Sequence, residues 1–127
     1  MAYLAREDAL AARQRPRNLM ETCSAILVLA FPYAPPAVEK TINRSEGRFA
    51  AYALSTDYHR SLPELGERLM ENCAANFGNL GAYRIFADSS PILERELAGR
   101  AGLGWIGKNS CLIHPHFGSY FLLAEIF

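Results

Sequence analysis

The pattern of apolar and polar positions along the chain predicts three helices and four strands. Residues 25–31 are apolar throughout and are followed by Pro32, which is typical of a fully buried strand. Residues 61–77 give the clearest helix, because apolar residues recur there at steps of three or four and line one face. That expected buried face consists of Leu62, Leu65, Leu69, Cys73 and Phe77.

The ends of this central helix carry their own signals. Ser61 and Glu64 have the spacing of a capping box, Pro63 falls in the first turn, and Gly78 is a helix stop. Further helices are expected at residues 4–12 and at residues 90–100, the second with Ser90 as its N-cap. The other strands are expected at residues 82–87, 110–113 and 119–126, the last two joined by a turn. This order predicts an α/β (α+β) sandwich, a mixed sheet flanked by helices.

The composition is that of a folded protein. Half of the 127 residues are hydrophobic and one-fifth are charged, and a chain of this length builds one domain with its own core. We therefore expect a single domain over residues 1–127. The longest apolar run has seven residues, whereas a membrane span needs about 20.

Charge narrows the possible partners. The thirteen basic and thirteen acidic residues balance, which excludes a nucleic-acid binder that works through bulk charge. The first 17 residues are nevertheless locally basic, through Arg6, Arg13, Arg15 and Arg17. Charged residues also interrupt the first ten positions, unlike a signal peptide, so we expect a cytoplasmic protein.

The cysteines and histidines do not form a metal motif. Cys23, Cys73 and Cys111 lie too far apart to hold an iron–sulfur cluster by themselves. His114 and His116 are a weak metal signal, because zinc motifs need a second close pair. We expect no metal site made by this chain alone.

A glycine-rich loop lies at residues 102–108. Its sequence, GLGWIGK, matches the G-x-G-x-x-G pattern of dinucleotide-binding loops. Here, however, the loop follows a predicted helix and leads towards a strand, the reverse of the dinucleotide arrangement. Two readings remain open: a helix end with a tight turn, or a backbone that a large flat ligand can approach closely.

Two polar segments are candidates for chemistry. Asp88 sits between a predicted strand and a predicted helix, where it is either a helix cap or a carboxyl group that faces a site and donates a proton. Residues 57–59, the run Asp57-Tyr58-His59, either relay protons and hold a ligand or simply connect to the central helix.

Several segments together resemble one family. The most specific is the run from Asp88 to Asn109, whose last eighteen residues read ILERELAGRAGLGWIGKN. Others lie at residues 1–4, 13–16, 25–33, 52–59, 118–119 and 123–126. In these segments the chain resembles the N-terminal, cobalamin-binding domain of epoxyqueuosine reductase, over essentially its whole length.

The resemblance implies a fold, a reaction and cofactors. The fold would be nitroreductase-like, and the reaction would reduce epoxyqueuosine to queuosine in tRNA, the last step of queuosine synthesis. The family uses cobalamin and two [4Fe-4S] clusters, and Asp88 matches its proposed proton donor. The resemblance also implies cobalamin contacts at Arg13, Ala50 (on a strand beside the corrin), Asp88, Leu93, Glu94, Arg95, Lys108, Asn109, Leu112 and Leu123.

The chain also departs from the family pattern. The cluster cysteines follow a strand like residues 118–126, and this chain ends at Phe127. We therefore expect a fragment, a split gene product or a remnant, which depends on an iron–sulfur segment or an external electron donor. Two other readings stay open: a non-catalytic corrinoid-binding module, and a related nitroreductase-like flavin oxidoreductase.

Overall fold

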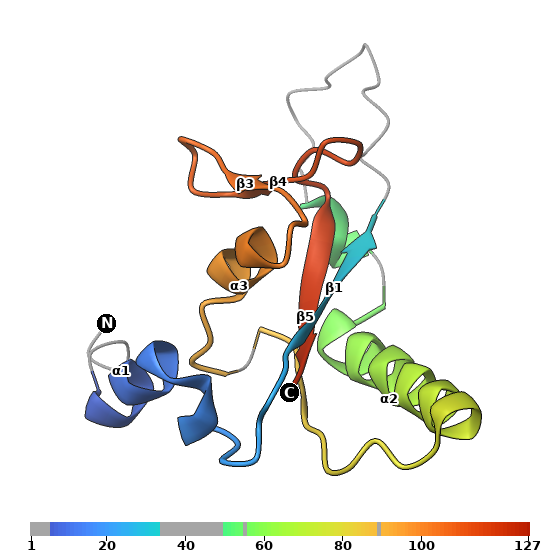
Figure 1. Ribbon diagram of the computed structural model, residues 1–127. Coiled ribbons are helices and arrows are strands. Elements are labelled where there is room, and N and C mark those ends of the chain that lie inside the picture. The colour runs from blue at the N-terminus through green and yellow to red at the C-terminus, as the bar shows by residue number, and fades with distance from the viewer. Residues whose placement is uncertain (1–5, 34–49, 55, 89) are drawn as a thin grey trace, which may run out of the picture.

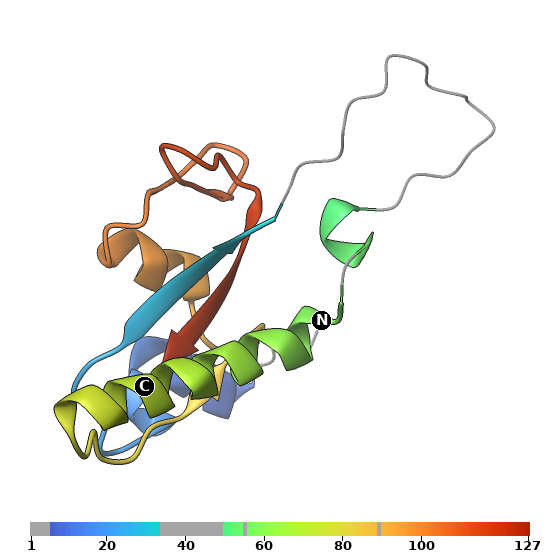
Figure 2. The same cartoon turned by 90° about the vertical axis from the view of Figure 1, so that its right-hand side faces the viewer.

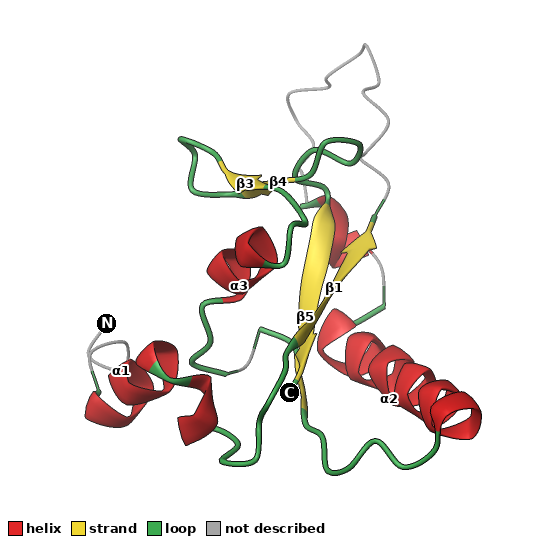
Figure 3. Ribbon diagram, in the orientation of Figure 1, coloured by secondary structure: helices red, strands yellow, loops and turns green. Residues whose placement is uncertain are grey.

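A three-stranded antiparallel sheet forms the centre of the computed structural model, which describes residues 6–33, 50–54, 56–88 and 90–127. The central strand β5 (Phe121–Ile126) pairs with β1 (Leu27–Pro32) on one side and with β2 (Ile85–Phe86) on the other (Figures 1 and 3). Leu29 lies opposite Ala124, and Ile85 lies opposite Ile126. The prediction of a mixed sheet was wrong, because both pairings are antiparallel.

Helices cover both faces of this sheet. Figure 2 shows α2 (Tyr58–Phe77) lying across the near side of β1 and β5, with α3 (Glu94–Arg100) and α1 (Glu7–Gln14) behind them. On the α2 side the buried core contains Leu62, Ala87 and Ala124. On the α3 side it contains Val28, Ala98 and Leu112, next to a cluster around Cys23, Phe86 and Phe127. The predicted α/β sandwich is confirmed at this level.

The smaller elements lie around this centre. Two 3-10 turns occur at Pro16–Asn18 and Ala51–Leu54. A second, two-stranded sheet pairs β3 (Trp105–Ile106) with β4 (Leu112–Ile113) above α3 (Figure 1). Among the described residues, no helix is both long and apolar enough to cross a bilayer.

Helix α2 begins earlier than predicted. Asp57 is its N-cap, because its side chain accepts a hydrogen bond of 3.0 Å from the backbone N–H of His59. The predicted cap, Ser61, therefore lies inside the first turn, and Pro63 lies inside the helix. The end was predicted correctly: Gly78 follows Phe77 at a φ of +84°.

The apolar face of α2 is only partly buried. Leu62 is buried, but Leu65 is exposed and Phe77 is 81% exposed. Leu65 lies off the buried face, which at this end of the helix consists of Leu62 and Gly66. For Phe77 the reason is length: a 20-residue helix is about 30 Å long, whereas β1 and β5 have six residues each and span about 20 Å. The C-terminal part of α2 thus extends beyond the sheet (Figure 1).

Strand β1 is not fully buried, contrary to the prediction from its apolar sequence. It begins at Leu27, which is 47% exposed, and Val28 is its one buried residue. The strand is at the edge of the sheet, so its side chains have a neighbouring strand on one side only.

The segment after β2 differs most from the sequence prediction. Strand β2 is limited to two residues, and α3 starts at Glu94 with Leu93 at the N-cap and no side-chain cap, so the prediction of Ser90 as the cap was wrong. The glycine stop of α3 is confirmed: Gly102 has a φ of +84°, and the N–H of Leu103 donates to the carbonyl of Ala98.

The glycine-rich loop contains an element that the sequence did not predict, strand β3. The next strand, β4, pairs with β3 rather than with β5. The predicted turn between β4 and β5 is present, closed by two hydrogen bonds between His114 and Gly118. The expected helix start at residue 4 lies outside the described residues.

Candidate active site

Asp88 lies where β2 ends and the chain turns towards α3. Its φ is +55°, a left-handed conformation that is uncommon for a residue other than glycine. Its backbone N–H donates a 2.8 Å hydrogen bond to Oε1 of Glu94, which holds this turn. Because α3 begins only at Glu94, Asp88 does not cap that helix, and one of the two readings from the sequence is excluded.

Two side chains from the start of α2 converge on the Asp88 carboxylate. The hydroxyl of Tyr58 donates a 2.6 Å hydrogen bond to Oδ2 of Asp88, and this acceptor raises the pKa of Tyr58 well above its usual range. Nε2 of His59 lies 3.6 Å from the same oxygen. The side chain of Asp88 is 58% exposed, so the group faces solvent.

His59 is itself held in place on two sides. Its Nδ1 lies 3.0 Å from Oδ1 of Asp57, and its ring stacks on Tyr58 with 4.1 Å between the ring centroids. The Asp57–His59 contact lowers the pKa of Asp57, chiefly through this hydrogen bond. The run at residues 57–59 is therefore a connection to α2 and also a set of groups around Asp88.

A second layer of carboxyl groups lies behind Asp88. Glu94 is partly buried, and this burial raises its pKa, as does the charge of Asp88. Glu125 on β5 is fully buried, and neither of its carboxylate oxygens has a hydrogen-bond partner. Burial, and then the charges of Glu94 and Asp88, raise the pKa of Glu125 to about 8.

Sequence reasoning missed Glu125. The signal that was available is a lone acidic residue between Ala124 and Ile126 in an otherwise apolar strand. Its burial follows from its place on the central strand of the sheet, which only the topology reveals.

Asp88 borders a surface hollow of about 510 Å³ between α3 and the β3–β4 sheet. Its wall carries apolar side chains, of which Leu93 and Ile106 are exposed, and hydrogen-bonding groups such as Ser110. The exposed ring of Trp105 precedes Ile106 on β3. The lining residues are Asp88, Ser90, Ile92, Leu93, Glu94, Arg95, Glu96, Ile106 and Ser110.

Four of the residues predicted to contact a cofactor meet at this hollow: Asp88, Leu93, Glu94 and Arg95. The Arg95 guanidinium donates to the carbonyl of Ser110 and so ties α3 to the loop between β3 and β4. Exposed apolar surface beside several polar groups suits a large, mostly apolar ligand with polar edges.

Arg13 lies in an adjoining hollow of about 290 Å³. The two hollows share Ile92, Leu93 and Glu96, so α3 separates them only partly. Arg13 comes from α1, which the sequence places 75 residues before Asp88.

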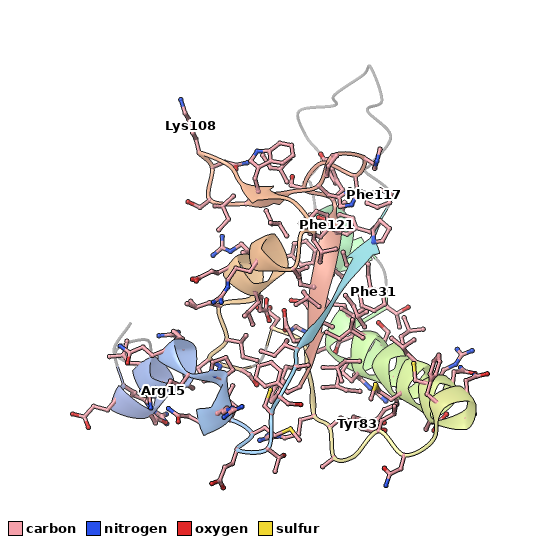
Figure 4. All side chains as sticks on the ribbon, viewed as in Figure 1. Arg15, Phe31, Tyr83, Lys108, Phe117 and Phe121 are labelled. Atoms are coloured by element: carbon pink, nitrogen blue, oxygen red, sulfur yellow. The ribbon has the colours of Figure 1, made fainter. Side chains whose placement is uncertain are left out.

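The structure places the remaining predicted residues elsewhere. Lys108 extends from the tip of the β3–β4 loop into solvent (Figure 4), and Oδ1 of Asn109 accepts a hydrogen bond from the N–H of Cys111 within that loop. Leu112 is buried in the core cluster against which the half-buried Leu123 packs. Ala50 lies directly before the 3-10 turn Ala51–Leu54, and its expected place on a strand was wrong.

Within the part of the chain that the structure describes, no three histidine, cysteine or acidic side chains are grouped so as to bind a metal ion. Cys23 is buried in the core, whereas Cys73, expected on the buried face of the central helix, is half-buried. Among the described residues, the candidate active site is therefore the cluster of side chains around Asp88.

Comparison with known proteins identifies the family. The family model described as "Epoxyqueuosine reductase QueG, DUF1730" matches residues 13–89, a stretch that includes both Arg13 and Asp88. The chain belongs to the epoxyqueuosine reductase family. The family match thus confirms the resemblance inferred from the sequence segments.

Full-length relatives agree with this assignment. An epoxyqueuosine reductase of Xanthomonas campestris pv. campestris is 41% identical over 119 residues, which cover 91% of this chain and 33% of the relative. One from Vibrio cholerae is 38% identical over 129 residues, covering 99% of this chain and 34% of the relative. The chain therefore spans about a third of the length of these relatives.

Solved structures show the same fold. The structure of epoxyqueuosine reductase from Streptococcus thermophilus superposes with a TM-score of 0.79 at 27% identity, over 93% of this chain and 32% of that one. An epoxyqueuosine reductase in complex with an epoxyqueuosine-modified tRNA stem loop gives a TM-score of 0.72 at 27% identity, over 92% of this chain and 32% of that one. The small α/β sandwich described above is thus an epoxyqueuosine reductase fold.

Proposed function

We propose that this chain is the cobalamin-binding part of an epoxyqueuosine reductase and that it takes part in reducing epoxyqueuosine to queuosine in tRNA. Family membership supports the reaction class. The observation that carries the proposal is the position of Asp88: an exposed carboxyl group held by Tyr58 and Glu94 at the border of a partly apolar hollow.

The residues around this hollow suit cobalamin, a wide and mostly apolar disc with amide groups at its edge. Leu93 and Ile106 would contact the apolar face, and Arg95 and Ser110 would offer hydrogen bonds to the amides. Arg13, in the adjoining hollow, would contact a more distant part of the cofactor. We also propose that this fold is related to the nitroreductase-like folds.

When bound, cobalamin would supply the two-electron chemistry, and the protein would supply orientation and protons. Asp88 is the proposed general acid, which gives its proton to the epoxide oxygen as a carbon–oxygen bond breaks. The Tyr58 hydroxyl orients the carboxyl group through Oδ2, and the turn held by Glu94 fixes the backbone. The electrons would come from an iron–sulfur segment or another low-potential donor.

The tRNA partner requires a basic surface, and one lies on the α1 side of the molecule. A hollow of about 780 Å³ is lined by Arg15, Arg17 and Arg100, and none of the described residues that line it is acidic. The Arg17 side chain donates a 3.0 Å hydrogen bond to the carbonyl of Cys23, which positions it. We propose that this surface binds phosphate groups of the tRNA. We also propose that the protein acts in the cytoplasm, where tRNA is modified.

Cobalamin binding is the direct test. Equilibrium dialysis of the folded chain against cobalamin is expected to show retained cofactor with a corrin absorption spectrum, and no comparable retention of FMN. Ile106→Glu should weaken binding, because it places a charge on the exposed apolar wall of the hollow. Phe77→Glu is the matched control, since Phe77 is exposed at the far end of α2.

Two results would contradict the proposal. The first is a folded protein that retains no cobalamin, or that retains FMN instead. The second is an equal effect of the two substitutions, which would show that binding does not involve the hollow beside Asp88.

A further inference from the structure

The chemistry of the proposed reaction demands more protons than Asp88 holds. Removing the oxygen of an epoxide to leave an alkene consumes two electrons and two protons and releases one water molecule. A single carboxyl group carries one proton. If Asp88 is the acid, as proposed above, a second proton must reach it or the substrate during each turnover.

The geometry of His59 fixes which of its nitrogens carries a proton. Nδ1 lies 3.0 Å from Oδ1 of Asp57. The pKa of Asp57 is lowered, so this carboxylate is ionised near neutral pH and can only accept a hydrogen bond. Nδ1 must therefore be the donor, and a neutral His59 is the Nδ1–H tautomer.

The other nitrogen of His59 faces Asp88. Nε2 is 3.6 Å from Oδ2, the oxygen that also accepts from Tyr58. With Nδ1 committed to Asp57, a stable arrangement of Nε2 and Oδ2 has one proton between them, because otherwise two lone pairs would face each other. The gap is slightly longer than a hydrogen bond, as is common for catalytic pairs in the absence of substrate.

From this arrangement we propose that His59, held by Asp57, recharges Asp88 with the second proton of the reaction. Asp88 first gives its proton to the epoxide oxygen as one carbon–oxygen bond breaks. Nε2 of His59, whose side chain is partly exposed, then takes up a proton from solvent and passes it to Oδ2 of Asp88. Asp88 delivers it to the departing hydroxyl as the second carbon–oxygen bond breaks, and water leaves.

The balance closes with groups that are present or already named. Two electrons come from the low-potential donor, and His59, whose side chain is 47% exposed, regains its proton from solvent. The carboxylate of Asp57 accepts the hydrogen bond from Nδ1–H and so orients the ring towards Asp88. Tyr58 donates to Asp88, and Glu94 accepts from its backbone. Two further titratable groups lie nearby: Tyr52, whose ring packs edge-on against Tyr58, and Arg60, whose charge helps to lower the pKa of Asp57.

Asp57 also caps α2, so a test must separate the two roles. Asp57→Ser keeps a good N-cap but removes the carboxylate that faces the ring. In long-range ¹H–¹⁵N spectra of the folded chain, neutral His59 is expected as the Nδ1–H tautomer, and in Asp57→Ser as the usual Nε2–H tautomer. The Nε2–H form in the unsubstituted chain would overturn the proposal, and this measurement needs neither cobalamin nor turnover.

Turnover supplies the second test. With cobalamin-loaded protein, a low-potential chemical reductant and an epoxyqueuosine-containing stem loop, His59→Ala is expected to lower the rate by at least about tenfold. Added imidazole should restore much of it. His116→Ala, in the turn before β5, is the matched control and should leave the rate unchanged.

Asp88→Asn separates the two proposals. If this variant is inactive and imidazole does not rescue it, while His59→Ala keeps the parent rate, only the role of His59 is overturned. If Asp88→Asn itself keeps the parent rate, the proposed function of Asp88 fails as well.

Discussion

At the scale of single residues, three carboxyl groups near one another differ because their surroundings differ. Asp88 is exposed and accepts a hydrogen bond from Tyr58. Glu94 is partly buried and accepts from the backbone of Asp88. Glu125 is fully buried without a partner, and its pKa is raised to about 8. Burial thus raises the pKa of Glu94 and of Glu125, although both are ordinary acids in the sequence.

Asp88→Asn should abolish most turnover while leaving the fold and cobalamin binding intact. The amide is isosteric and still accepts the Tyr58 hydrogen bond, but it cannot donate a proton as an acid does. The expected loss is about 10²–10⁴-fold in single-turnover rate, measured with cobalamin and a chemical reductant. Glu71→Gln, on the exposed surface of α2, is the control. Loss of cobalamin binding in Asp88→Asn would instead assign the residue to cofactor binding.

Glu125 should make the protein less stable as the pH rises. Its pKa is about 8 in the folded chain and near the ordinary glutamate value, about 4, in the unfolded chain. Above about pH 4 the carboxyl group therefore ionises more readily in the unfolded chain, and this shifts the equilibrium towards unfolding. The stabilisation by the neutral Glu125 carboxyl group is complete below the pKa that this group has in the unfolded chain, and it is lost as the pH rises through about 8. The difference in the free energy of unfolding is on the order of 4 kcal/mol between these limits.

Glu125→Gln tests this coupling. Urea unfolding followed by circular dichroism from pH 4 to pH 9 should show a flatter profile for the variant, which becomes the more stable form at high pH. Asp57, whose pKa is also altered, does not act on Glu125, so its contribution is common to both proteins and cancels in the comparison. Parallel profiles for the two proteins would contradict a buried, neutral Glu125.

At the scale of elements, the β3–β4 sheet requires a glycine at position 104. A Cβ atom on Gly104 would lie 2.1 Å from the carbonyl oxygen of Ile113, a distance that no side chain tolerates. The close approach that the glycine pattern predicted is therefore made to the chain's own strand β4. Gly104 in this loop is therefore explained by the close pairing of β3 and β4, without any contact to a ligand.

Gly104→Ala should therefore destabilise the protein by more than about 2 kcal/mol, because β3 must move away from β4. Gly102→Ala is the matched control: its φ is also positive, but a Cβ there meets nothing within 4 Å, so the cost is about 1 kcal/mol of backbone strain. Thermal unfolding measures both. Equal midpoints for the two variants would show that the β3–β4 contact is not tight in solution.

At the scale of the whole molecule, charge is balanced in sum but not in space. The arginine-lined hollow lies on the α1 side, and the candidate active site lies between α2, α3 and the β3–β4 sheet. Figure 4 shows Arg15 at the α1 end of the molecule, away from Lys108 at the tip of the β3–β4 loop. A polyanion such as RNA would thus be attracted by the local positive charge of the arginine-lined hollow, although the net charge of the whole chain is zero.

Arg15→Gln should weaken binding of a stem-loop RNA. If Arg15 contacts one phosphate, the slope of log K against log salt concentration should become shallower by about 0.7–0.9. Fluorescence anisotropy over a salt series measures this change. Arg68→Gln, on exposed α2, removes the same charge from the opposite face and should leave the slope unchanged; an equal change in both would show non-specific attraction.

The candidate site was partly predictable from the sequence. Asp88, Leu93, Glu94 and Arg95 are close in sequence and remain close in space, so a local motif sufficed to find them. Leu112 illustrates the opposite case: its apolar side chain is consistent with ligand contact or core packing, and its packing against Ala98 of α3 decides for the core.

The sequence by itself determined the sandwich class, the glycine stops of α2 and α3, and the family, because these depend on local patterns. Only the tertiary structure decided that Asp88 meets Tyr58 and His59, about thirty residues earlier in the chain, and that Glu125 is fully buried. It also placed β1 at an edge and paired β4 with β3. The physical reason is that burial, edge position and side-chain encounters depend on which strands become neighbours, and residue periodicity does not specify that.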